Sequence, residues 1–435
     1  MWGKAFVGAA GEGCGVQPQR IGAVQGSALY VGAVLGTGVI GLPALAAERA
    51  GPASLIAWAG MILLSVPLAA TFAALGARHP DSGGVSTYAR RAFGDSAAVV
   101  VGWCFFFAIP VGAPAAALFA GAYVADAAGG GRATVVATAA TLILGVGLAN
   151  SAGVQVSARL QLLLGGLLLA LLLGSVAVSL PHARERNLHP FAPHGWAAVG
   201  SAGALLVWCI AGWEAITHLA AEFRHPERDI VRASVVALVV VGVAYLGVAF
   251  ASVAVLGRRA DSSHAPLAQL MATALGGSAR TFAAVVAVLL TAGVLNAYFA
   301  GAAKLGAALG RDGALPAWLA HGSVAGEIPR RSLGVLTVLA TASLAVVELA
   351  NVDVTPLVRL TSAQLATVYA IGVAAALRLL PRGSRAWWAG VCSLVGVALV
   401  LALSGRYLAW PLALAVAAAA FARPTSRRLK ARTAR

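Results

Sequence analysis

Residues 34–43 decide the fold, and they read Val34-Leu35-Gly36-Thr37-Gly38-Val39-Ile40-Gly41-Leu42-Pro43. The stretch lies inside a long apolar run, yet each glycine weakens a helix by about 1 kcal/mol relative to alanine. Pro43 removes a backbone donor and clashes with the preceding turn. The sequence therefore predicts a helix that is interrupted in the middle of an apolar segment.

The composition places that segment in a membrane. Of the 435 residues, 60% are apolar and only 11% are charged, whereas soluble proteins carry about 25% charged residues. The mean hydropathy is +0.86. So few charges cannot cover a water-exposed surface, so most of the chain must face lipid or its own interior. These values argue against a soluble enzyme.

We predict an all-α membrane protein with twelve transmembrane helices, because a spanning helix needs about 20 mostly apolar residues. The expected spans are 22–46, 53–76, 97–125, 133–150, 157–180, 198–221, 231–256, 281–308, 333–350, 355–378, 386–403 and 406–422. The gaps between them are too short for a soluble domain.

The net charge of +16 does not indicate a nucleic-acid partner. Basic residues lie in the short gaps and in the stretch 423–435, the pattern of topology anchors at an anionic bilayer surface. Most of the 31 lysine and arginine residues fall on the side of the N-terminus. We therefore expect a multi-pass protein of the cell inner membrane with both termini cytoplasmic.

A second interruption follows at residues 208–215, which read Trp208-Cys209-Ile210-Ala211-Gly212-Trp213-Glu214-Ala215. The interrupted spans are the first and the sixth, which hold equivalent places in an inverted repeat of five helices. Paired, glycine-interrupted spans at corresponding positions indicate a transporter binding site. The alternative is close helix packing, for which membrane helices commonly use glycine.

Unwinding explains what such a site could bind. Free amides at the N-terminus of one half-helix hold an anion, and free carbonyls at the C-terminus of the other hold an ammonium group. An α-amino acid zwitterion needs both.

Glu214 is the one acidic residue that we place deep inside a span. A charge at the bilayer centre costs about 2.5–3.5 kcal/mol, so a carboxyl group that gains and loses a proton there suits proton sensing. The alternative is a protonated side chain that only hydrogen-bonds freed backbone.

Other chemistries lack their motifs. Cys14, Cys104, Cys209 and Cys392 lie far apart without a CxxC pair, so we expect no metal site and no disulfide framework. No HExxH or phosphate-binding GxxxxGK[ST] motif occurs. We therefore expect no cofactor and no enzyme activity. A channel stays open as an alternative function, since broken helices can also line a pore.

Four blocks of sequence resemble the amino acid–polyamine–organocation (APC) superfamily of secondary transporters, and within it the bacterial branch that exports methionine and branched-chain amino acids. Together they cover about residues 22–320. They are Gly36-Thr37-Gly38-Val39 with Leu42-Pro43, then Pro80-Asp81-Ser82-Gly83-Gly84 to Ala92-Phe93-Gly94, then Gly212-Trp213-Glu214-Ala215 with Glu222 to Asp229, and Asn296-Ala297-Tyr298 with Gly310 to Pro316.

The resemblance implies a five-plus-five inverted repeat of the LeuT-like kind with broken helices 1 and 6. The implied division is a cytoplasmic N-tail at 1–21, a first repeat at 22–180, a second at 198–378, two extra helices at 386–422 and a basic cytoplasmic C-tail at 423–435.

The resemblance also implies the site. The substrate-binding residues would be Gly36, Thr37, Gly38 and Val39 with Cys209, Ile210, Ala211 and Gly212, the amides near Thr37 holding a carboxylate and the carbonyls of 209–211 facing an ammonium group. Gate or pocket aromatics would be Trp208, Trp213 and Tyr298, and Glu214 would sense protons.

The expected substrates are neutral apolar amino acids of the leucine, isoleucine, valine and methionine class, because the implied pocket is lined mainly by apolar residues. The resemblance to the exporting branch implies efflux, and Glu214 would link it to H+ by antiport. Uptake or exchange of amino acids, and transport of polyamines, stay open as alternatives. Besides the substrate and the lipid bilayer, a homodimer partner is left open.

Overall fold

The computed structural model describes residues 22–79, 84–153, 158–214, 217, 223–257, 265–323 and 327–433, and its regular elements there are helices. The first half of the chain forms α1 (Ala23–Val34), α2 (Gly38–Ala50), α3 (Ser54–Arg78), α4 (Gly84–Phe93), α5 (Asp95–Ala128), α6 (Arg132–Ser151) and α7 (Ala158–Ser179). The second half forms α8 (Ala197–Ile210), α10 (Pro226–Ala251), α11 (Pro266–Leu275), α12 (Ser278–Arg311), α13 (Arg330–Leu349), α14 (Thr355–Leu379), α15 (Arg385–Ser404) and α16 (Ala409–Thr433).

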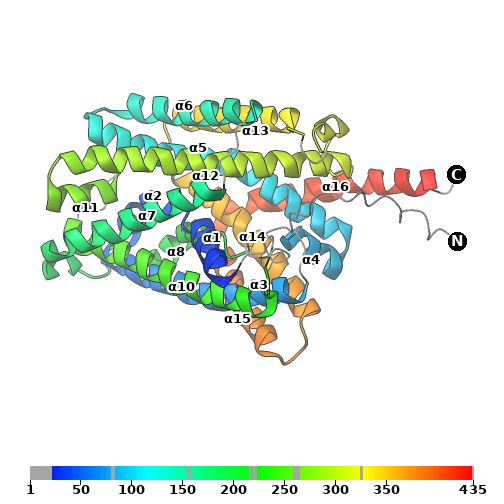
Figure 1. The fold of residues 1–435 in the computed structure, drawn as a ribbon, viewed down its shortest axis with the longest axis horizontal. Helices are drawn as coiled ribbons and strands as arrows, with labels where there is room; N and C mark the ends of the chain where they lie inside the picture. Colours follow the sequence, from blue (N-terminus) through cyan, green and yellow to red (C-terminus); the bar gives the residue numbers. More distant parts are fainter. Residues whose placement is uncertain are drawn as a thin grey trace, which may run out of the picture.

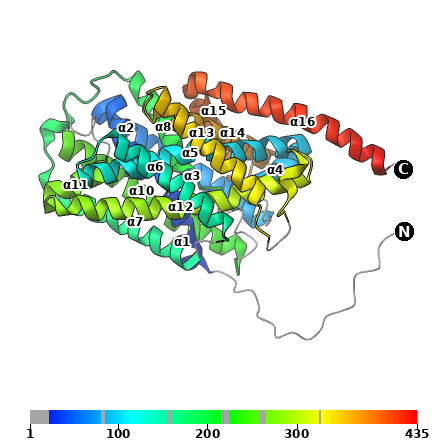
Figure 2. The ribbon, with the colours of Figure 1, turned by 90° about the horizontal axis from the view of Figure 1, so that it is seen from above.

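The long helices run side by side along the longest axis of the molecule (Figure 1). The short helix α11 lies at one end of this bundle, and α4 lies at the other in both views (Figures 1 and 2). The helix α16 extends past the bundle at the α4 end. A polar backbone in hydrocarbon must be satisfied internally, which a bundle of helices achieves.

Nine stretches of the described chain are long and apolar enough to span a membrane. Two of them, Gly38–Arg78 and Arg385–Phe421, each contain parts of two predicted spans, while α1 and α8 are shorter apolar helices. An all-helical, multi-pass membrane protein is therefore confirmed, whereas the twelve-span inverted repeat stays a prediction.

Both predicted interruptions are present. The first span divides into α1 and α2, with Thr37 preceding the start of α2. The helix α8 ends at Ile210, and Ala211 then adopts an extended conformation with ψ of 133°. The breaks therefore lie at the glycine-containing stretches 35–37 and 211–214, as the sequence predicted, whereas Pro43 lies inside α2 and does not end a helix.

Two features differ from the sequence-based expectation. The gap at 257–280 contains α11, a helix of 10 residues that is too short to count as a span. The expected C-tail at 423–435 continues as helix α16 to Thr433. The expected N-tail at 1–21 lies outside the described residues.

The helix α5 occupies the centre of the bundle, and 61% of the residues in its most apolar 18-residue stretch are buried. Glycines let other helices approach it closely. A Cβ atom on Gly121 would lie 2.4 Å from the carbonyl oxygen of Val135 in α6. Because that neighbour is backbone, the two helices would have to separate to admit a side chain.

We expect Gly121→Ala to destabilise the protein by about 1–3 kcal/mol, the usual cost of overpacking. Gly145 is the matched control, because it lies on α6 and a Cβ atom there would meet no neighbouring side chain or helix within 4 Å. Thermal unfolding of both variants in detergent measures the difference. Equal midpoints would contradict the close approach of α5 and α6.

Candidate functional site

The two interruptions pack against each other. Gly212 has a φ of +121°, and a Cβ atom there would lie 2.7 Å from the carbonyl oxygen of Ala33, in the last turn of α1. In turn, a Cβ atom on Gly38 would lie 3.0 Å from Cδ1 of Trp208 and 3.3 Å from Sγ of Cys209. The end of α1, the start of α2 and the end of α8 therefore meet at one place.

This meeting point brings opposite backbone charges together. The first amides of α2, beginning at Thr37 and Gly38, have no acceptor inside the helix, and they lie at its positive dipole end. The last carbonyls of α8, which ends at Ile210, lie at a negative dipole end. The arrangement can hold a carboxylate and an ammonium group a few ångströms apart.

Four fully buried tyrosines satisfy carbonyl groups at the interruptions. Their hydroxyl groups donate to backbone oxygens: Tyr30 to Trp213 at 2.6 Å, Tyr123 to Ile40 at 2.8 Å, Tyr245 to Val34 at 2.8 Å and Tyr369 to Ile210 at 2.8 Å. They come from α1, α5, α10 and α14, so four helices stabilise the breaks. This role of the tyrosines was not predicted from the sequence, although a buried tyrosine needs a hydrogen-bond partner and an interrupted helix offers one.

Glu214 is buried, with 8% of its surface exposed. Its Oε2 accepts from the amide of Gly212 at 2.9 Å and lies 2.5 Å from the hydroxyl oxygen of Tyr369. Its own carbonyl oxygen accepts from the hydroxyl of Thr217 at 2.6 Å. The carboxyl group is thus fixed to the unwound segment after α8 and to α14.

A first cavity opens beside the interruptions, with a volume of about 380 Å³. We call it the break-side cavity. It is lined mainly by aliphatic residues of α1, α7 and α12, and Glu214 is its only acidic or basic residue among the described ones. Gly36, Thr37, Gly212 and Tyr298 also line it.

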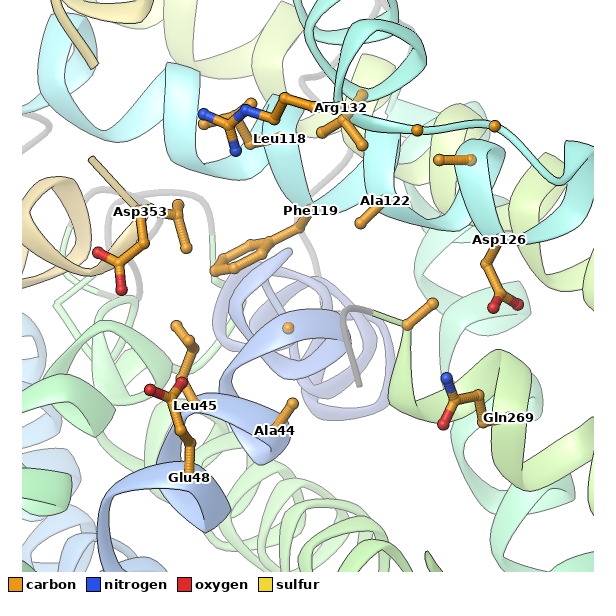
Figure 3. Close-up of a pocket in the computed structure, with 17 residues that line it drawn as sticks. Ala44, Leu45, Glu48, Leu118, Phe119, Ala122, Asp126, Arg132, Gln269 and Asp353 are labelled. Carbon is orange, nitrogen blue, oxygen red and sulfur yellow. The ribbon is translucent and has the colours of Figure 1, made fainter. Parts of the chain in front are cut away.

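A second cavity, of about 430 Å³, lies near α11 and is lined by α2, α5, α6 and α11 with the start of α14. We call it the α11-side cavity. Figure 3 shows Glu48 and Asp353 on one side of Phe119, and Asp126 and Gln269 on the other. Its described lining carries three carboxyl groups and the guanidinium group of Arg132, whereas Glu214 is the one charged residue among those described for the break-side cavity. No sequence pattern pointed to these residues as a group.

A thin layer separates the two cavities. Ile40 lines the break-side cavity and Gly41, the next residue, lines the α11-side cavity. Phe119 packs on Gly41 so closely that a Cβ atom there would lie 2.3 Å from its ring. The ring centroid of Phe119 lies 6.5 Å from that of Trp208. The first turn of α2 thus lies between the two cavities, and both aromatic rings pack against it: Phe119 on Gly41 and Trp208 on Gly38. Trp208 itself lines neither of the two cavities.

The predicted site residues lie close together around the two breaks, but their side chains have different surroundings. Trp208 lies between α2 and α5, because Gly38 and Gly112 both approach its indole ring. The side chain of Val39 is fully buried. Trp213 lines neither large cavity; it is buried, and its Nε1 donates to the hydroxyl of Ser65 in α3 at 2.9 Å.

The remaining predicted residues lie at the end of α8 and directly after it. The amide of Ala211 donates to the carbonyl of Trp208 at 3.2 Å, and Cys209 is a buried free thiol. No group of three or more potential metal ligands occurs among the described residues.

Comparison with known proteins places these features in context. The model of a family described as amino acid permease matches residues 21–422. The chain is 34% identical over 394 residues to the uncharacterized amino acid permease YecA of Bacillus subtilis, an alignment that covers 91% of this chain and 93% of that protein.

Two further relatives have more specific names, and each alignment covers about half of both chains. The L-methionine/branched-chain amino acid exporter YjeH of Escherichia coli is 40% identical over 233 residues, 51% of this chain and 53% of that protein. The branched-chain amino acid permease BcaP of Bacillus subtilis is 24% identical over 240 residues, 51% and 52% of the two chains.

We expect Gly212→Ala to lower thermal stability by about 2 kcal/mol or more, because positive φ costs strain and the methyl group would press on the end of α1. Gly36→Ala is the control at the other interruption, where the only atom near its Cβ position is 4.0 Å away. Unfolding midpoints in detergent measure both. A Gly212→Ala protein as stable as Gly36→Ala would show that the interruptions do not depend on this contact.

Proposed function

Because the chain belongs to the amino acid permease family of the APC superfamily, we propose that it is a secondary active transporter of neutral apolar L-amino acids of the leucine, isoleucine, valine and methionine class. The observation that carries the proposal is the contact between the two interrupted helices. It puts the amide end of α2 beside the carbonyl end of α8, the pair of groups that an amino acid zwitterion requires.

The substrate site that we propose keeps the residues inferred from the sequence. The amides near Thr37 and Gly38 bind the carboxylate, and the carbonyls of residues 209–211 accept from the ammonium group. The aliphatic lining of the break-side cavity supports an apolar side chain. Its one charged residue among the described ones, Glu214, is already bound to the amide of Gly212 and the hydroxyl of Tyr369, and burying a further charge in an apolar lining is costly.

Two cavities on either side of a thin layer support alternating access. The α11-side cavity and the break-side cavity lie on either side of the first turn of α2, against which Phe119 and Trp208 pack. We propose that Trp208 and Phe119 gate the passage between them, and that the α11 end faces the outside of the cell. The twelve-span, five-plus-five inverted repeat provides the two bundles that move against each other.

We propose coupling to protons through Glu214, whose carboxyl group binds the unwound segment of the sixth span. Export is the direction that the similarity to YjeH supports. Uptake is the second candidate, which the weaker similarity to BcaP supports.

Transport in proteoliposomes tests the coupling. With wild type, we expect labelled leucine or methionine to accumulate on the acidic side of an imposed pH gradient. One pH unit is worth about 1.4 kcal/mol per proton, or about tenfold accumulation at one proton per substrate. We expect Glu214→Gln to carry out exchange without this accumulation.

A flux that is the same with and without the pH gradient, and the same in wild type and Glu214→Gln, would show that Glu214 does not couple transport to protons. Accumulation on the alkaline side would indicate symport and hence uptake.

Competition against labelled leucine tests the substrate class. We expect unlabelled methionine, isoleucine and valine to compete well, because one methylene is worth only about 1–3 kcal/mol in an apolar pocket. Arginine should be about a hundredfold weaker, since a charge at membrane depth costs about 2.5–3.5 kcal/mol. Stronger displacement by arginine than by methionine would overturn this assignment.

A further inference from the structure

The hydroxyl group of Tyr369 faces two acceptors at once. Its oxygen lies 2.8 Å from the carbonyl oxygen of Ile210 and 2.5 Å from Oε2 of Glu214, and it accepts from the amide of Gly212 at 3.0 Å. A tyrosine hydroxyl carries a single hydrogen. It can therefore donate to the Ile210 carbonyl or to the Glu214 carboxylate, but not to both.

The charge of Glu214 decides between the two acceptors. When the carboxyl group is ionised, it can only accept, and a hydrogen bond to a charged acceptor is about twice as strong as a neutral one. Tyr369 then donates to Glu214, and the Ile210 carbonyl is left without the hydroxyl hydrogen.

Protonation reverses the arrangement. A proton from water binds a Glu214 carboxylate oxygen, and the new carboxyl O–H donates to the hydroxyl oxygen of Tyr369. The Tyr369 hydrogen rotates to the Ile210 carbonyl. The covalent O–H bond of Tyr369 stays intact, and the only net change is one proton gained at Glu214.

We propose that Tyr369 is a positioning residue that carries the protonation state of Glu214 to the Ile210 carbonyl, so that a proton and the ammonium group of the substrate compete for that carbonyl. The inference rests on the proposed function, in which this carbonyl binds the substrate. It adds a mechanism: mutual exclusion of proton and substrate at one site is the condition for antiport. Because binding linkage is reciprocal, substrate also promotes release of the proton.

Among the described residues, three ionisable side chains interact with Glu214: Tyr369 of α14, Tyr30 of α1 and Tyr298 of α12. The hydroxyl of Tyr30 donates to the carbonyl of Trp213 instead. His218 follows in the sequence but lies outside the described residues, so the experiment includes His218→Gln.

The first test is a double substitution read out by equilibrium binding of labelled leucine to purified protein at about pH 8. Glu214→Met keeps the side-chain length and removes the strong acceptor, which commits the Tyr369 hydrogen to Ile210. We expect weaker binding. Adding Tyr369→Phe frees the carbonyl, and we expect it to restore affinity by about three- to tenfold over Glu214→Met alone, the value of one hydrogen bond.

A purely structural role predicts the opposite sign, because losing a second buried hydrogen bond would weaken binding further or leave it unchanged. Tyr30→Phe on the Glu214→Met background is the matched control, since it also removes a buried hydroxyl from this segment. We expect no recovery from it. Recovery with Tyr30→Phe, or none with Tyr369→Phe, overturns the proposal.

The second test needs only the single variant. We expect wild type and His218→Gln to bind leucine more weakly at about pH 5 than at about pH 8, and Tyr369→Phe to show a ratio of dissociation constants that is smaller by about twofold or more. An unchanged ratio in Tyr369→Phe, or loss of the pH dependence in His218→Gln, overturns the switch while leaving amino acid binding intact. Absence of saturable binding of any apolar amino acid to wild type overturns the proposed function, and the switch with it.

Discussion

The structure depends on how two broken helices satisfy their backbone groups inside a membrane. Hydrocarbon offers no partner for a free amide or carbonyl, so an interruption is stable only where protein surrounds it. Here each break packs against the other: Gly212 lies on the last turn of α1, and Gly38 lies on the last turn of α8. Hydroxyl groups from four helices then satisfy carbonyls along both segments. The same contact that stabilises the breaks assembles the opposite charges of the proposed site.

The two cavities differ in chemistry, and the difference follows their place in the fold. The α11-side cavity lies among helix ends and loops, and its wall carries Glu48, Asp126 and Asp353. The break-side cavity lies among the middles of α1, α7 and α12, where aliphatic residues prevail. A zwitterion that enters from the polar cavity would exchange water for backbone dipoles at the breaks. Glu214 is the one charged group placed beside that exchange among the described lining residues.

The sequence predicted the breaks because glycine acts locally, through its low helix propensity; Pro43 was expected to contribute, yet it lies inside α2. It also predicted that residues near 36–38 and 208–214 meet, since paired interruptions imply a shared site. The tyrosines were out of reach for a physical reason. Tyr30 and Trp213 are 183 residues apart, and a single tyrosine in an apolar helix leaves no periodic signal. The helix α11 was missed because 10 residues are too few for a span. The sequence placed Trp213 with Trp208 among the gate or pocket aromatics. In the structure the Trp213 indole is buried, and its Nε1 donates to the hydroxyl of Ser65.

Each of the four tyrosines at the breaks donates to a backbone carbonyl oxygen, and Tyr369 also contacts the carboxyl group of Glu214. A carbonyl is the same whichever residue carries it. A substitution at Ile40, which lines the break-side cavity, can therefore alter the shape of that cavity while the bond from Tyr123 to its carbonyl remains. In the proposed transporter, this wall of the pocket can change by a single substitution that leaves the scaffold's hydrogen bonds in place.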